Sequence, residues 1–73
     1  MRLDELKVGQ SATVTKVNGE GALRRRVMDL GVTKGVVVTV RKTAPLGDPM
    51  ELILRGYSLT VRKDDATIVE VEL

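Results

Sequence analysis

The side chains that most often perform catalysis or hold transition metals are absent from this sequence, which contains no histidine and no cysteine. Their absence removes the commonest general base, the most reactive nucleophile and the two commonest transition-metal ligands. Ser11 and Ser58 remain, but a serine nucleophile needs an activating base beside it, and nothing in the sequence marks one. We therefore expect a protein that is not an enzyme and that carries no cofactor.

Carboxylates are the remaining candidates for metal ligands. Asp64 and Asp65 are adjacent, whereas Glu20 and Asp29 stand on either side of a basic segment. Carboxylate oxygens suit hard cations such as Mg²⁺ and also bind Fe²⁺, but neither pair has the spacing of a ligand set. Two aspartates at the start of a helical turn more often stabilise its positive end. We predict no metal site, and any Fe²⁺ binding by the isolated protein should be weak.

The most distinctive charged feature is the run of Arg24, Arg25 and Arg26. On a helix, which turns by about 100° per residue, these side chains point in three directions and cannot form one basic patch. Arg24 and Arg26 flank an apolar stripe, while Arg25 points outward near Asp29. Met28 lies off that stripe, so it is either exposed to solvent or covered by a neighbouring loop. The run is therefore either a solvated helix face or a docking surface.

The composition of the whole chain favours one small domain, residues 1–73, that is rich in strands. Tyr57 is the only aromatic residue, so the core is aliphatic and β-branched. The net charge of +2 is too balanced to indicate a nucleic-acid-binding protein by itself. No apolar run approaches the roughly 18 residues of a membrane-spanning helix, and residues 1–4 do not begin a signal peptide. We expect a cytoplasmic protein without membrane insertion.

Alternation of apolar and polar residues predicts five short strands, at residues 11–17, 36–42, 50–55, 58–62 and 67–73. Leu23, Val27 and Leu30 recur at helical spacing after the first strand, which predicts one amphipathic helix over residues 21–30, capped by Asn18. Residues 63–66 offer a single helical turn. Since the local turns leave no room for parallel crossovers, we predict a mainly β fold, an antiparallel sheet curled into a small barrel.

The inward-facing positions of these elements predict a single core. Its members are Leu23, Val27, Leu30, Val38, Val40, Leu52, Leu54, Leu59, Val61 and Val71. Ile53 and Ile68 are placed outside it. Residues 44–49, which contain two prolines and a glycine, form a loop because proline cannot donate to a sheet ladder.

The order of these pieces resembles the ferrous iron transport protein A (FeoA) family across nearly the whole chain. Residues 23–35 are similar to the family's basic helix and its Leu-Gly-hydrophobic-x-x-Gly turn, with Lys34 in place of the usual proline. Residues 44–49 resemble the family's loop, and residues 55–66 resemble the hairpin and turn that follow. The resemblance implies an SH3-like barrel of five strands. It also implies a role beside FeoB, a membrane ferrous iron transporter whose cytosolic part binds GTP.

Three alternatives stay open at this point. The same fold occurs at the end of iron-dependent repressors of the diphtheria toxin repressor type, where it is an appended regulatory domain. The DNA-binding domain and the metal-binding histidines of those repressors have no counterpart in this sequence. Small barrels also bind nucleic acids, but Tyr57 alone provides no aromatic platform for stacked bases. Finally, one of the three consecutive arginines could act in trans on the transporter's GTPase site. The favoured prediction is an accessory or regulatory protein that binds the transporter's cytosolic domain and is a monomer or a weak homo-oligomer.

We expect the partner-binding surface on the exposed side of the helix and on a loop adjoining it. Its residues are Arg24, Arg25, Met28, Pro45, Leu46, Gly47 and Asp48. Two prolines restrict the loop, so it loses little entropy on docking, and Leu46 at its tip offers an apolar contact. The arginines would complement an acidic partner. The alternative is that the loop only joins two strands.

Overall fold

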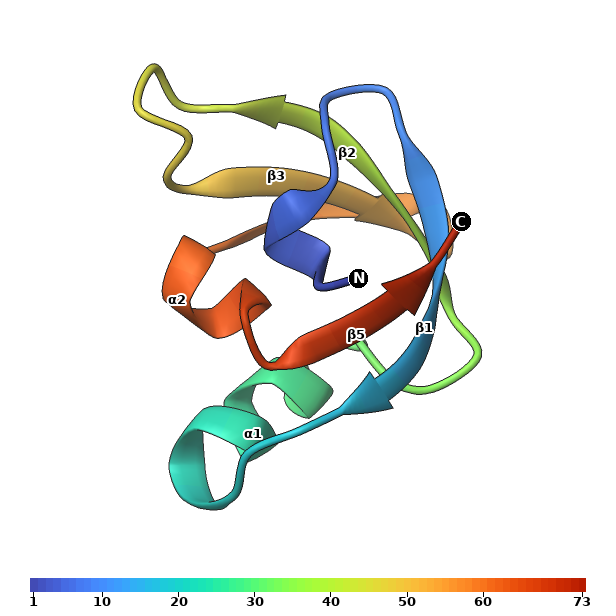
Figure 1. The fold of residues 1–73 in the computed structure, drawn as a ribbon, viewed down its shortest axis with the longest axis vertical. Helices are drawn as coiled ribbons and strands as arrows, with labels where there is room; N and C mark the ends of the chain where they lie inside the picture. Colours follow the sequence, from blue (N-terminus) through green and yellow to red (C-terminus); the bar gives the residue numbers. More distant parts are fainter.

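The computed structural model describes residues 1–73 and contains one sheet with two helices. The elements are β1 (Ser11–Val17), α1 (Gly21–Asp29), β2 (Val37–Thr43), β3 (Met50–Leu54), β4 (Tyr57–Val61), α2 (Lys63–Ala66) and β5 (Val69–Glu72), after a short 3₁₀ turn at Leu3–Glu5. The five strands, the helix after the first strand and the single helical turn are thus confirmed, with boundaries that move by one or two residues. Figure 1 shows the arrangement.

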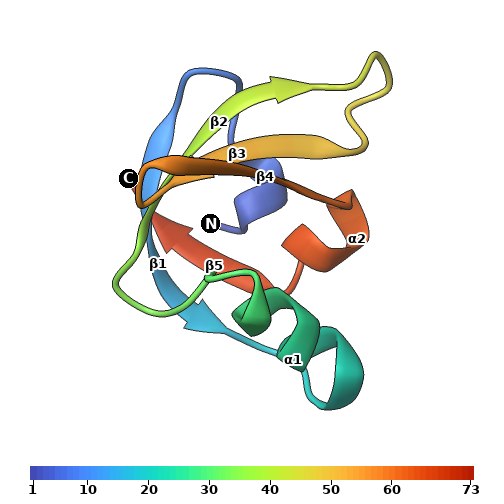
Figure 2. The same ribbon diagram turned by 180° about the vertical axis from the view of Figure 1, so that it is seen from behind.

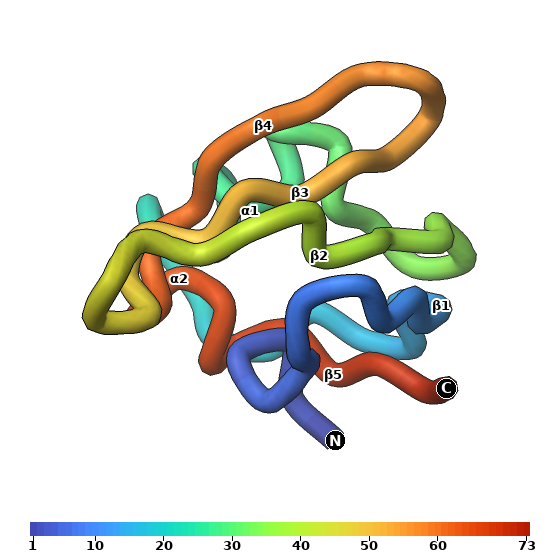
Figure 3. The backbone as a smooth tube through the Cα atoms, turned by 90° about the horizontal axis from the view of Figure 1, so that it is seen from above, coloured from blue at the N-terminus to red at the C-terminus, as the bar shows by residue number.

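All neighbouring strands of the sheet are antiparallel, in the order β4-β3-β2-β1-β5. Seen from above, the strands follow one another in this order and the sheet curls strongly (Figure 3). Irregular pairing interrupts β1 between Val14 and Lys16 and β2 between Val40 and Lys42. Such bulges bend a strand and increase its twist. The sheet therefore has the curvature of a small barrel, although β4 and β5 remain its two edges and do not pair.

The core consists of 17 buried side chains, nearly all aliphatic. Seven of the predicted core residues belong to it, namely Val27, Val38, Val40, Leu52, Leu54, Val61 and Val71. Leu30 and Leu59 are only partly buried and pack against it, and so does Ile68, which was predicted to lie outside. Leu23 was predicted wrongly, because the short helix α1 contributes only Val27 to the buried cluster.

The predicted cap of the helix is also wrong. Helix α1 begins after Glu20, and no side chain caps it. Asn18 extends the pairing of β1 with the C-terminal segment beyond the two strands. Its backbone N–H donates to the carbonyl of Ile68 at 2.7 Å. Its side-chain amide donates to the Glu70 carboxylate. The side chain of Asn18 is thus bonded to β5 and does not cap α1.

Candidate partner-binding surface

Helix α1 is held to the rest of the molecule by a few contacts, and its three arginines remain exposed. Val27 anchors it in the core with 1% of its surface exposed. Arg24 Nε donates to the carbonyl of Val17 at 3.3 Å, at the end of β1. Arg25 is exposed, whereas Met28 is partly buried and packs against the core. Of the two predicted environments of Met28, the covered one is therefore closer to the structure.

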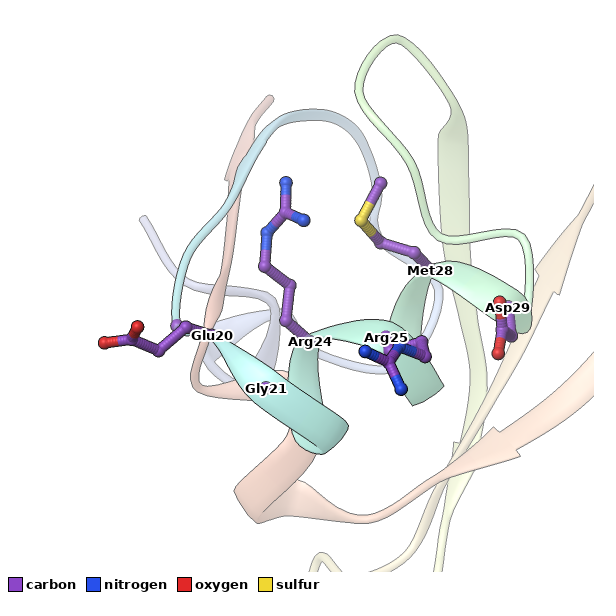
Figure 4. A pocket seen from close by; sticks show the side chains of 7 residues that line it. Glu20, Gly21, Arg24, Arg25, Met28 and Asp29 are labelled. Carbon is purple, nitrogen blue, oxygen red and sulfur yellow. The ribbon is translucent and has the colours of Figure 1, made fainter.

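Arg24, Arg25 and Met28 line one open depression of about 570 Å³, together with Gly19, Glu20, Gly21 and Asp29. Figure 4 shows that the side chains of Arg24 and Met28 extend in a similar direction, whereas Arg25 points elsewhere. Consecutive arginines therefore diverge, as helical geometry requires. No ion pair joins Arg25 to Asp29, so the Arg25 guanidinium remains available to a partner.

The loop between β2 and β3 presents Leu46 at its tip with 93% of its surface exposed. Two backbone bonds fix its shape: Gly47 N–H donates to the Ala44 carbonyl at 2.7 Å, and Ala44 N–H donates to Pro49 at 3.0 Å. The carboxylate of Asp48 accepts a bond of 2.9 Å from the backbone N–H of Lys63. The loop is therefore hydrogen-bonded to the start of α2, and these bonds fix the position of its exposed apolar tip.

The loop and α1 do not adjoin each other. They lie at opposite ends of the long axis on the same side of the molecule, and α2 lies between them in both side views (Figures 1 and 2). Asp48 bonds to Lys63 at one end of α2, and Arg26 pairs with Asp65 nearer the other end, at 2.9 Å. The prediction that the loop adjoins the helix was wrong, because α2, which lies between them, comes from much later in the chain.

Asp65 is the one charged residue among the buried side chains, and its pairing with Arg26 was not predicted. The prediction assigned Asp64 and Asp65 the same role at the start of the helical turn. Only Asp65 turns inward, next to buried Ala66, whereas Asp64 is exposed. A separation of 39 residues leaves no local pattern that could reveal the Arg26–Asp65 pair. This pair joins α1 to α2 and so holds the charged helix in place.

Replacing Asp65 with alanine should lower the free energy of unfolding by about 1–2 kcal/mol, since one partner of this charged hydrogen bond is largely exposed. Arg26→Ala should cost at least as much, because it leaves a buried carboxylate without its partner. Urea denaturation of both single variants and the double variant measures the coupling. The double variant should lose less than the sum, and strictly additive losses would show that the pair does not stabilise the fold.

No group of three or more acidic side chains lies in a position to hold a metal ion. Asp65 is occupied by Arg26, and Glu20 and Asp29 line the same depression without converging on a third carboxylate. None of the helices combines the length and the apolar composition that crossing a bilayer requires.

The strand order, the strong curvature and the helix after β1 define a small SH3-like barrel domain. A family model described as the FeoA domain matches residues 1–73, and this chain belongs to the FeoA family. The resemblance seen in the sequence is thereby confirmed.

Several relatives support this assignment. The chain is 40% identical over 73 residues to the Fe(2+) transport protein A/Fe(2+) transporter FeoB fusion protein of Porphyromonas gingivalis, of which it spans 9%. It overlays on a FeoA-like protein from Clostridium acetobutylicum with a TM-score of 0.93 and 37% identity, covering all of this chain and 85% of that one. It overlays on zinc-complexed Stenotrophomonas maltophilia FeoA, described as a prokaryotic SH3 domain protein, with a TM-score of 0.84 and 30% identity, covering 99% and 89%.

The fold is shared with metal-dependent repressors, as the family resemblance also implied. The chain overlays on a manganese-dependent transcriptional repressor with a TM-score of 0.86, covering 41% of that chain, but the identity is 13%. At that level the similarity shows the fold alone.

Proposed function

We propose that this chain is a cytoplasmic accessory protein of ferrous iron uptake that binds the cytosolic GTP-binding domain of a FeoB-type membrane transporter. One observation carries the proposal: a relative that is 40% identical over the whole chain joins both proteins in one polypeptide. Fusion keeps two domains at a high effective concentration, which is useful when they work in contact. The absence of histidine and cysteine agrees with a role in binding rather than in catalysis.

The side of the molecule that carries α1, α2 and the loop between β2 and β3 is the proposed docking surface. A stable interface of standard size takes about 800 Å² from each partner. The whole protein exposes 4524 Å² and its longest extent is 29 Å. An interface of that size would therefore reach from Leu46 at one end of this side to Arg24 and Arg25 at the other.

Arg24→Glu combined with Arg25→Glu should slow association with the transporter's cytosolic domain by about tenfold at low salt, because surface charges act mainly on the encounter rate. The difference from the wild type should shrink as salt is added. Glutamine at both positions should give an intermediate rate. Surface-plasmon kinetics on folded variants measures this, and wild-type association rates at low salt would remove α1 from the docking surface.

Leu46→Ala should instead raise the dissociation rate, since removal of a desolvated apolar anchor acts mainly on the lifetime of a complex. The barrel should stay folded, because Leu46 lies on the loop outside the core. Val37→Ala is the matched control: Val37 is also exposed, at 55%, but stands at the end of β2 farthest from the loop. Equal dissociation rates for the two variants would mean that the loop only joins β2 and β3.

A further inference from the structure

The two edges of the sheet are treated differently by the fold. The outer edge of β5 is covered by the start of the chain, since Arg2 forms a bridge with Glu70 and the N–H of Val71 donates to the Met1 carbonyl at 2.7 Å. The outer edge of β4 has no such cover. No backbone hydrogen bond reaches it from a turn, a loop or a cap. Figure 2 shows β4 at the front of the sheet, with α1 below it.

The hairpin between β3 and β4 determines which groups of β4 point outward. Arg55 and Gly56 form its two-residue turn, and both have positive φ, at 50° and 82°, as in a type I′ turn. In such a hairpin the flanking residues Leu54 and Tyr57 exchange both backbone bonds, and hydrogen-bonded pairs then alternate with non-bonded ones. Ser58 and Thr60 fall in non-bonded pairs. Their N–H and C=O groups therefore point away from β3, into the open edge.

A groove of about 450 Å³ runs beside this edge, between β4 and the two helices. It is lined by Thr60 and Arg62, by Arg26 and Leu30, and by Asp65. The carboxylate of Asp65 is taken by Arg26, which itself keeps 61% of its side chain exposed. The charge of the groove that is left to interact with a binding partner is therefore positive. Arg55 adds a further cation at the other end of β4, which contains no acidic residue.

From these observations we propose that β4 binds an extended acidic segment of a partner protein as an additional strand of the sheet. The segment would bond to the backbone groups of Ser58 and Thr60, and its carboxylates would meet Arg26 and Arg62. Strand addition of this kind uses main-chain bonds for affinity and side chains for specificity. That the transporter supplies the segment rests on the function proposed above, whereas recognition of an acidic strand does not.

A second copy of this chain fits the edge less well. Antiparallel pairing of two β4 strands would bring Arg55 of one copy toward Arg62 of the other, at both ends of the ladder. Like charges opposite each other destabilise a strand pair. An acidic strand reverses the sign of this interaction, which is why a partner of that chemistry is favoured.

Amide hydrogen exchange by NMR tests the proposal without the transporter. The probe is a short, capped peptide of alternating glutamate and valine, and a peptide with lysine in place of glutamate is its control. In the free protein the amides of Ser58 and Thr60 should exchange much faster than that of Leu59. At about nine-tenths saturation with the acidic peptide their exchange should slow by about tenfold, because only the free fraction exchanges. The lysine peptide should leave them unchanged.

Thr60→Pro provides the matched variant, because proline removes only an outward-pointing N–H from an edge strand. It should weaken binding of the acidic peptide at least about tenfold, whereas Thr60→Ala, which keeps the N–H, should bind as the wild type does. Arg62→Glu should weaken binding even if Thr60→Pro fails to fold.

Three results would overturn the proposal. They are no protection of Ser58 and Thr60 at millimolar acidic peptide, equal binding of the lysine peptide, and protection that rises with protein concentration in the absence of peptide. The last would identify a second copy as the occupant. None of them bears on binding of the transporter through α1 and the loop, which the kinetic experiments test separately.

Discussion

Leu52→Ala should lower the free energy of unfolding by about 2–5 kcal/mol, the usual cost of removing a large aliphatic side chain from a core. Leu52 is completely buried at the centre of β3, where it pairs with Val40 on one side and with Leu59 on the other. Domains of this kind are stable by only about 0.05–0.15 kcal/mol per residue, so the loss is a large share of the total stability.

Ile53→Ala is the matched control for this experiment. Ile53 is the next residue on the same strand but points to the opposite face, with 37% of its surface exposed. Because Ile53 is already partly in contact with water, its truncation loses less burial, and we expect its denaturation midpoint in urea to fall less than that of Leu52→Ala. An unchanged midpoint for Leu52→Ala, or a larger loss for Ile53→Ala, would mean that β3 faces the other way.

Gly31→Ala should lower the free energy of unfolding by about 1.5–3.5 kcal/mol, through two separate effects. Gly31 follows the last turn of α1 with φ of +98°, a conformation that costs other residues about 1–2 kcal/mol. An added methyl group would also overlap the hydroxyl of Tyr57. That hydroxyl donates to the Leu30 carbonyl at 2.8 Å, and displacing it would lose a hydrogen bond of about 0.5–1.5 kcal/mol.

Tyr57→Phe separates the two effects. Without the hydroxyl, the nearest atoms to the added methyl are Leu54 Cδ1 at 3.6 Å and the ring carbon of residue 57 at 3.7 Å, both in ordinary contact. In the Tyr57→Phe background, Gly31→Ala should therefore cost only the backbone strain. Thermal or urea denaturation of the four proteins gives the difference. The same cost in both backgrounds would show that Tyr57 does not restrict position 31.

The strands and α1 could be predicted from sequence because their patterns are local. Val38 and Val40, or Leu52 and Leu54, alternate over neighbouring positions, and a strand with one buried face requires that alternation. The buried Leu3 of the 3₁₀ turn was missed, because a turn of three residues carries no periodicity. Its place in the core depends on packing against elements from the far end of the chain.

For the candidate surface, the sequence predicts the exposure of single residues but not how they are arranged in space. The exposure of Leu46 and Arg25 follows from a loop tip and from a helix face, both of which are local features. The position of α2 between them depends on Arg26 with Asp65 and on Asp48 with Lys63. These contacts join residues 39 and 15 positions apart, for which the sequence shows no pattern. The open edge of β4 likewise depends on which strands end up as neighbours.

The proposed docking surface and the proposed strand-binding edge of β4 share a border at the end of α1. The groove beside β4 is lined by Arg26 and Leu30 near the end of α1, the helix that carries the proposed docking residues Arg24 and Arg25. A partner that placed an acidic strand on β4 would therefore also lie close to the charged face of α1.

The most direct test is an NMR titration of the isotope-labelled protein with the cytosolic GTP-binding domain of a FeoB-type transporter. We expect saturable shifts or broadening of amide signals in α1, in residues 44–49 and at Ser58 and Thr60, while the amides of β1 stay unperturbed. Unchanged spectra at a several-fold excess of that domain, or changes confined to β1, would contradict the proposed function and its docking surface.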